Sequence, residues 1–206
     1  MKPSIQQQGN KSKKSAFNAI ITLIKSVVRG IMKVLIAISG ASGASLGIKA
    51  LRALPEDVEK HLILSDHANI VLQKEENITI HKDEAIWASV ASGSFGVDAM
   101  MVIPCSMNTL AKISVGIADN LTTRAASVMI KEQKKLLLAP REMPFSPIAL
   151  ENMHKLSTLG IIIAPPVMAY YSGQESLEQM ETFMIGKWFD LIGIENSLYR
   201  RWSDDA

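Results

Sequence analysis

Cysteine is almost absent from this 206-residue chain, in which Cys105 is the only one. A single cysteine excludes an intramolecular disulfide and a zinc site built from several cysteines. The histidines do not supply a metal site either, because their spacing matches neither H-x-x-x-H nor H-E-x-x-H. We therefore expect no metal centre, and we interpret Cys105 and the histidines as packing or surface residues. The histidines are His61, His67, His81 and His154.

Long apolar runs and the common nucleotide-binding motifs are also missing. No stretch reaches the roughly 18 apolar residues that are typical of a membrane span. Gly40, Gly43 and Gly47 follow the first apolar run, but their spacing does not give G-x-G-x-x-G, and no G-K-[ST] occurs. These absences exclude a dinucleotide fingerprint and a P-loop.

Charge is unevenly distributed. The formal net charge is +2, yet residues 1–31 hold six basic residues and no acidic one, whereas the other 175 residues hold 16 basic and 20 acidic ones. The body of the chain is therefore slightly acidic, which gives no electrostatic reason to expect nucleic acid as a partner. We expect residues 1–31 to be a disordered or dispensable N-terminal extension and residues 32–206 to form one folded domain.

Residues 16–31 combine apolar side chains with two cations. This pattern is typical of a basic amphipathic helix that lies on a membrane or directs a protein to an organelle. The alternative is a start codon placed too far upstream, because Met32 directly precedes an apolar strand. We predict a cytoplasmic protein, with organelle targeting and membrane contact through residues 16–31 as the alternatives.

Short apolar runs alternate with helical patterns along the rest of the chain. With 48% hydrophobic and 20% charged residues, the composition is that of a globular protein with a substantial core. The alternation predicts βαβ units, and hence a single doubly wound α/β domain of Rossmann or flavodoxin-like type with a parallel sheet and a ligand beyond the carboxyl ends of its strands. The predicted strands are 33–38, 58–65, 100–104, 136–139 and 161–164. The predicted helices are 43–54, 66–73, 121–133, 147–159 and 175–192.

Small and hydroxylated residues follow two of the predicted strands. Residues 39–44 (SGASGA) let a phosphate approach backbone N–H groups at a helix N-terminus, with hydroxyls from Ser39 and Ser42. A tight packing turn without a ligand is the alternative. Ser106 and Thr109 follow the strand at 100–104, where they either cap the next helix or bind a second face of the same ligand.

Charged residues lie at two further places where a ligand would bind. Arg124 and Lys131 are two helical turns apart, so they lie on one face at a distance of about 10 Å. They suit a phosphate or form a solvated face. Arg141 and Glu142 directly follow a buried strand within a proline-flanked segment that limits backbone freedom. They line a ligand site or form a structural ion pair.

Together these motifs resemble the UbiX-type flavin prenyltransferases, within the wider group of flavin-binding Cys/lantibiotic-decarboxylase-like flavoproteins. The resemblance extends over residues 32–202. The matching pieces, in chain order, are 40–44 (GASGA), 104–106 (PCS) with 109–110 (TL), 119–121 (DNL) with 124–126 (RAA), 131–132 (KE), 141–142 (RE) with Pro144, 150–153 (LENM), Tyr171 and 201–202 (RW).

The resemblance implies a metal-independent reaction. A dimethylallyl group from dimethylallyl phosphate is joined to N5 and then C6 of reduced FMN, and the prenylated FMN serves UbiD-type decarboxylases. The resemblance also implies a homo-oligomer, often a dodecamer in this family, with active sites shared between subunits. Ubiquinone biosynthesis is one of the pathways compatible with this function.

The resemblance also implies roles for individual residues. Lys187 stands where the family often has an arginine, so a point charge replaces a bidentate group. The implied FMN contacts are Gly40, Ala41, Ser42, Ser65, Ser106, Met107, Asn108, Thr109 and Arg141. The implied contacts to the prenyl phosphate are Arg124, Lys131, Arg141, Tyr171 and Lys187, and Trp202 shields the allylic cation. The residues implied in catalysis are Glu142, Glu75, Ser42 and Lys131, the two glutamates by managing protons.

Three other functions remain as alternatives. The first is an FMN-dependent decarboxylase of the phosphopantothenoylcysteine or peptidyl-cysteine type, whose early catalytic histidine would have to be His67 at an unsuitable spacing. The second is a flavin-binding or storage protein, against which Lys131, Arg141, Glu142 and Tyr171 argue, because flavin storage needs no prenyl-phosphate cluster. The third is a membrane-associated scaffold that depends on residues 16–31.

Overall fold

The computed structural model describes residues 30–40, 42–65, 77–170 and 173–201. The chain divides into two compact units, Met1–Met32 and Lys33–Ala206, and the elements below belong to the second. Several predictions fall outside the described residues: the helix at 66–73, the amphipathic segment at 16–29, and the roles of Ala41, His67, Glu75, Tyr171 and Trp202.

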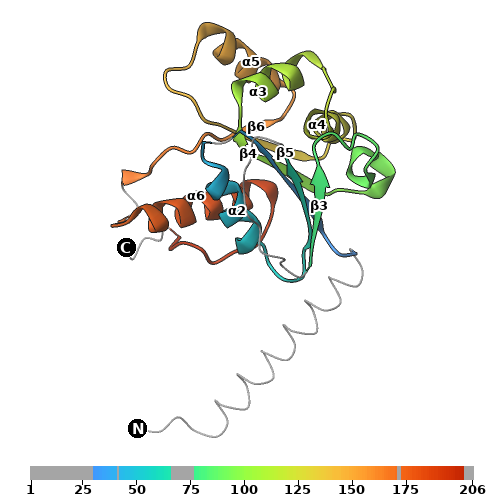
Figure 1. The fold of residues 1–206 in the computed structure, drawn as a ribbon. Coiled ribbons are helices and arrows are strands. Elements are labelled where there is room, and N and C mark those ends of the chain that lie inside the picture. The colour runs from blue at the N-terminus through green and yellow to red at the C-terminus, as the bar shows by residue number, and fades with distance from the viewer. Residues whose placement is uncertain (1–29, 41, 66–76, 171–172, 202–206) are drawn as a thin grey trace, which may run out of the picture. The chain divides into compact units, whose positions relative to one another are not determined.

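A six-stranded parallel sheet forms the centre of this unit, in the order β3-β2-β1-β4-β5-β6 (Figure 1). The order reverses between β1 and β4, which is where open α/β sheets bind ligands. The predicted doubly wound α/β fold with a parallel sheet is confirmed. The strands are β1 (Lys33–Ser39), β2 (Glu59–Leu64), β3 (Ile78–Lys82), β4 (Ala99–Cys105), β5 (Lys135–Pro140) and β6 (Ile162–Ile163).

Helices cover both faces of the sheet (Figure 1). Helices α2 (Ala44–Ala53) and α6 (Leu177–Ile192) contact each other on one face. Helices α3 (Met107–Val115), α4 (Leu121–Lys131) and α5 (Pro147–Thr158) pack together on the other. Because helices lie on both sides, β4 is buried along its whole length and β1 along all but its first residue, as expected for apolar runs in a parallel sheet.

Helix α2 lies unusually close to the sheet at Gly47. A Cβ atom at this position would lie 2.3 Å from the backbone oxygen of Ile103 in β4. Only glycine fits this contact without displacement of the helix. The close packing fixes the N-terminal half of α2 beside the carboxyl ends of β1 and β4.

The sequence patterns did not predict strand β3. Its five residues, ITIHK, contain no apolar run, and every side chain in it is at least partly exposed. β3 lies at the edge of the sheet, where a strand needs less burial. Among the described residues, no helix is long and apolar enough to cross a membrane.

Candidate functional site

The carboxyl ends of β1 and β4 are joined by Ser39. Its hydroxyl donates to the backbone oxygen of Pro104 at 3.2 Å and accepts from the backbone N–H of Ser106 at 3.1 Å. Sequence reasoning counted this hydroxyl among the ligand donors. In the structure it is buried and braces the point where the strand order reverses.

The turn after β1 leaves the start of α2 open. Gly40 and Gly43 have φ values of +144° and +86°, which residues with a Cβ rarely adopt. Gly43 is the N-cap of α2 and provides no side-chain hydrogen bond, whereas α3, α4, α5 and α6 each have a side-chain cap. Ser42 is exposed in the same turn. The first N–H groups of α2 are therefore free of a side-chain cap, in an arrangement that favours an anion.

Ser65 lies next to this turn, just beyond β2. Its backbone N–H donates to Ile38 of β1 at 3.4 Å, and its hydroxyl oxygen is buried with no hydrogen-bond partner among the described residues. A buried hydroxyl that remains unpaired costs on the order of 1–3 kcal/mol. A polar ligand at the carboxyl edge of the sheet would remove this cost.

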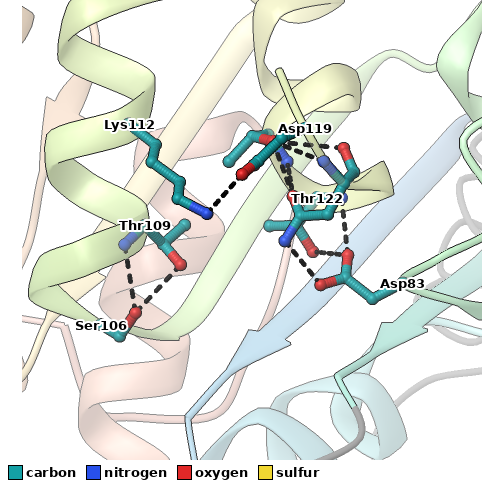
Figure 2. A network of polar contacts seen from close by, with 8 residues as sticks. Asp83, Ser106, Thr109, Lys112, Asp119 and Thr122 are labelled. Carbon is teal, nitrogen blue, oxygen red and sulfur yellow. Dashed lines mark hydrogen bonds and ion pairs between the residues drawn. The ribbon is translucent and has the colours of Figure 1, made fainter. Parts of the chain in front are cut away.

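Helix α3 begins at the same edge. Ser106 accepts a hydrogen bond from the backbone N–H of Thr109 at 3.2 Å and donates its own hydroxyl proton to Thr109 Oγ1 at 2.9 Å (Figure 2). Of the two functions left open by the sequence, capping is the one these contacts perform. Met107 is half-buried and Asn108 is exposed on the first turn.

Asp83 is a buried acidic residue that sequence reasoning missed. Directly after β3, it accepts hydrogen bonds from the Thr122 N–H at 2.8 Å, the Thr122 hydroxyl at 2.7 Å and Asn120 Nδ2 at 2.8 Å (Figure 2). These bonds fasten the start of α4 to the end of β3. They also place Arg124, in the first turn of α4, on the carboxyl side of the sheet. No local pattern around Asp83 signals this contact.

A surface ion pair supports the same loop. Lys112 donates to Asp119 Oδ2 at 2.6 Å (Figure 2), and this hydrogen bond lowers the pKa of Asp119 below its ordinary value. The pair connects α3 to the segment that precedes α4. Both side chains are partly exposed, and an exposed pair of this kind stabilises a fold only weakly.

Lys131 lies at the other end of α4, near the amino edge of the sheet. It forms an ion pair with Glu132. Nearby, Lys134 lies 3.6 Å from Asp98 Oδ1, at the start of β4. Arg141, in contrast, directly follows the carboxyl end of β5. A six-residue strand is roughly 17 Å long at about 3.3 Å per residue. Within one chain, the predicted grouping of Lys131 with Arg141 is therefore not formed.

Arg141 and Glu142 are both exposed. Glu142 Oε1 accepts a hydrogen bond from the backbone N–H of Met143 at 3.2 Å. Neither the guanidinium of Arg141 nor that of Arg124 has a hydrogen bond or ion pair with another described residue, so the structural Arg–Glu pair is not formed there. Within the described part of a single chain, the Glu142 side chain is therefore not enclosed by protein.

Lys187 is an exposed residue of α6. The next residue, Trp188, donates its indole N–H to the backbone oxygen of Ala164 at 3.1 Å. Ala164 directly follows β6, so this bond holds α6 against the carboxyl end of that strand. The Lys187 ammonium lies 5.8 Å from the centre of the Tyr199 ring.

The cysteine and the buried histidine of the described chain have structural surroundings. Burial raises the pKa of Cys105 to about 12, so its thiol is not a nucleophile at neutral pH. His61 is buried, with Nδ1 3.2 Å from His81 Nε2 and Nε2 2.9 Å from Glu59, which confirms a packing role. The described residues contain no group of three or more potential metal ligands.

Comparison with known proteins identifies the family of this chain. The Flavoprotein family model matches residues 24–185. The flavin prenyltransferase UbiX of Helicobacter pylori (strain ATCC 700392 / 26695) is 47% identical over 184 residues, which cover 83% of this chain and 98% of that protein.

Solved structures extend the likeness to the fold. AnUbiX (PadA1), in complex with FMN and dimethylallyl pyrophosphate, has a TM-score of 0.79 and 37% identity and covers 84% of this chain and 98% of its own. A dodecameric FMN-dependent UbiX-like decarboxylase from Escherichia coli O157:H7 has a TM-score of 0.78 and 39% identity, with coverage of 84% and 100%. A PPC decarboxylase mutant is more distant, with 24% identity and a TM-score of 0.57 over 68% of this chain and 84% of its own, and shows the fold alone. The chain therefore belongs to the UbiX family of flavin prenyltransferases.

Proposed function

We propose that this protein joins a dimethylallyl group from dimethylallyl phosphate to N5 and C6 of reduced FMN, and so makes prenylated FMN. The observation that carries the proposal is the high identity to flavin prenyltransferases over most of the chain, together with a structural relative that holds FMN and dimethylallyl pyrophosphate. The product would be the cofactor of a UbiD-type decarboxylase.

The carboxyl edge of the sheet fits FMN on two observations. Ser65 has a buried hydroxyl without a partner among the described residues, and α2 begins at Gly43 without a side-chain cap. Reduced FMN supplies the nucleophilic atoms N5 and C6. The side chains and turns that we propose to hold it are Gly40, Ala41, Ser42, Ser65, Ser106, Met107, Asn108, Thr109 and Arg141.

The cationic residues would bind and activate the prenyl phosphate. Its C–O bond breaks so that the phosphate leaves with the bonding electron pair, and the departing negative charge must be stabilised. Arg124 and Arg141 suit this task because their guanidinium groups have no hydrogen bond or ion pair with other described residues. Glu142 would pass a proton to the leaving phosphate once a ligand or neighbouring subunit buries it. The full proposed set is Arg124, Lys131, Arg141, Tyr171 and Lys187 for the phosphate, Glu75, Glu142, Ser42 and Lys131 in catalysis, and Trp202 beside the allylic cation.

The position of Lys131 supports an active site shared between subunits. Lys131 is at the amino edge of the sheet and Arg141 at the carboxyl edge, so the two cannot reach one small substrate from the same chain. The UbiX-like relative from Escherichia coli is a dodecamer. We propose that this chain also forms a homo-oligomer and that Lys131 completes the site of a neighbouring copy.

The decarboxylase alternative has less support. The PPC decarboxylase shares only the fold with this chain, and the histidine that this alternative requires, His67, lies outside the described residues. Simple flavin storage is disfavoured as well, because it gives no reason for the arginines at the ligand edge, Arg124 and Arg141, to lack partners among the described residues.

Anaerobic incubation of the full chain with reduced FMN and dimethylallyl phosphate tests the proposal. Mass spectrometry of the extracted flavin should show a gain of one five-carbon dimethylallyl unit. Parallel reactions with oxidised FMN, and with inorganic phosphate in place of the prenyl donor, should leave the flavin unchanged. Folded, FMN-loaded protein that returns only unmodified FMN would exclude the transferase function.

A further inference from the structure

The segment after α6 folds back onto that helix through Tyr199. The ring lies in a slot left by Gly186, where an added Cβ atom would lie 2.5 Å from Tyr199 Cδ1. Phe183 meets the same ring edge-on, with 5.0 Å between the ring centres. The place of the Tyr199 ring is therefore defined by packing on α6.

Asp190 fixes the other end of this ring. Its carboxylate accepts a hydrogen bond from the Tyr199 hydroxyl, two from the Arg201 guanidinium at 2.8 and 3.0 Å, and one from Asn196 Nδ2 at 3.0 Å. The hydrogen bonds from Arg201 and then Tyr199 lower the pKa of Asp190 below its ordinary value, so the carboxylate is ionised at neutral pH. We call Asp190, Asn196, Tyr199 and Arg201 the C-terminal clasp.

Two cations lie against the clasped ring. The Arg201 guanidinium carbon is 5.3 Å from the ring centre, but this side chain is already engaged by Asp190. The Lys187 ammonium is 5.8 Å from the ring centre and has no hydrogen bond or ion pair with another described residue. A cation within about 6 Å of an aromatic face is attracted to it, and this attraction leaves the ammonium protons of Lys187 available to an anion.

We propose that Tyr199 is a positioning residue for the prenyl-phosphate substrate: its ring holds the Lys187 ammonium in place, and Asp190 holds the ring. The inference rests on the proposed function, in which Lys187 binds the substrate phosphate. For each hydrogen bond formed on binding, a lysine side chain loses more conformational freedom than an arginine, whose planar group is pre-organised. The Tyr199 ring removes part of that freedom before the substrate arrives.

Loss of the Tyr199 ring should weaken the binding of dimethylallyl phosphate and leave the other steps unchanged. Cation–π contacts at exposed sites are worth about 0.5–1 kcal/mol, so replacing the ring with an aliphatic side chain should raise KM for dimethylallyl phosphate about 2- to 5-fold. Tyr199 is not among the proposed FMN contacts, and its contact with Lys187 has the same strength in the ground state and the transition state. The affinity for FMN and kcat should therefore stay within about two-fold of wild type.

The decisive experiment is a double-mutant cycle in the full-length protein. Tyr199→Leu removes the ring, and the matched control Tyr199→Phe keeps it while losing only the hydroxyl. We expect the largest rise in KM with Tyr199→Leu and a smaller rise with Tyr199→Phe, which keeps the ring but loses its hydrogen bond to Asp190. Tyr199→Leu should have no added effect in a Lys187→Ala background. An equal rise in KM with and without Lys187 would overturn the proposal, because the clasp would then be only structural.

A second variant keeps the test valid if Tyr199→Leu does not fold. Asp190→Asn preserves shape and weakens the charge-assisted bonds that hold the ring, so it should raise KM in the same direction and lose this effect in the Lys187→Ala background. An Asp190→Asn enzyme whose KM is unchanged would contradict the role of the clasp. Wild-type protein that forms no prenylated flavin would instead refute the proposed function, so the two failures are distinguishable.

Discussion

Complementation between two impaired variants, Lys131→Ala and Arg141→Ala, tests the shared active site. Lys131 and Arg141 lie at opposite edges of the sheet, separated by the roughly 17 Å length of β5 at about 3.3 Å per residue. A hydrogen bond to a charged group is worth about 1.5–3 kcal/mol, so Lys131→Ala and Arg141→Ala should each slow prenylation about 10- to 100-fold if each side chain binds the phosphate.

Co-expression of these two variants in equal amounts would then restore activity. If Lys131 completes a neighbour's site, random assembly of a homo-oligomer leaves about a quarter of the sites with both native residues. The assay is the anaerobic rate of prenylated flavin formation per subunit, with the two tagged chains purified as mixed oligomers. We expect a rate close to a quarter of wild type, well above either variant alone.

A matched pair of variants controls for nonspecific rescue. Arg141 and Glu142 are adjacent in the chain, so a mixture of Arg141→Ala with Glu142→Gln contains no site with both native residues. This mixture should show no recovery beyond the average of its components. Failure of Lys131→Ala and Arg141→Ala to complement, in oligomers shown to be mixed, would refute the division of the site between subunits.

Three further predictions follow from single contacts. Ser65→Ala should leave the free energy of unfolding unchanged or slightly raised, because the hydroxyl has no described partner, but should weaken FMN binding by about 1 kcal/mol, or roughly five-fold; equal FMN titrations for both proteins would contradict the role of Ser65. Gly47→Ala should lower the free energy of unfolding by about 1–3 kcal/mol, measured by denaturant titration, because its Cβ would lie 2.3 Å from the Ile103 oxygen; an unchanged midpoint would show that α2 can shift freely. Cys105, with its pKa raised to about 12, should resist a thiol reagent in native protein and react on unfolding; rapid native labelling would show that the thiol is accessible.

The sequence was most informative where apolar patterns were strong. The runs that became β1 and β4 predicted a parallel sheet, because a strand covered by helices on both faces must be apolar throughout. The edge strand β3 escaped prediction because its side chains alternate without an apolar run. Cys105 was correctly interpreted as a packing residue, and it is buried at the end of β4. The same burial raises the pKa of its thiol and makes it unreactive.

Long-range polar contacts could not be predicted from local patterns. Asp83 and Thr122 are separated by 39 residues in the chain. They meet only because β3 ends, and α4 begins, at the same edge of the sheet. The spacing of Arg124 and Lys131 correctly placed both on one helix. It did not reveal that the helix carries Lys131 to the edge opposite Arg141, because that depends on where β5 begins.

One reaction tests the central claim most directly: reduced FMN, dimethylallyl phosphate and the full-length protein without oxygen, with inorganic phosphate and flavin mass measured in the same samples. The account predicts that each phosphate released is matched by one flavin that has gained a five-carbon unit. Phosphate release without a change in flavin mass would show hydrolysis in place of transfer and would contradict it.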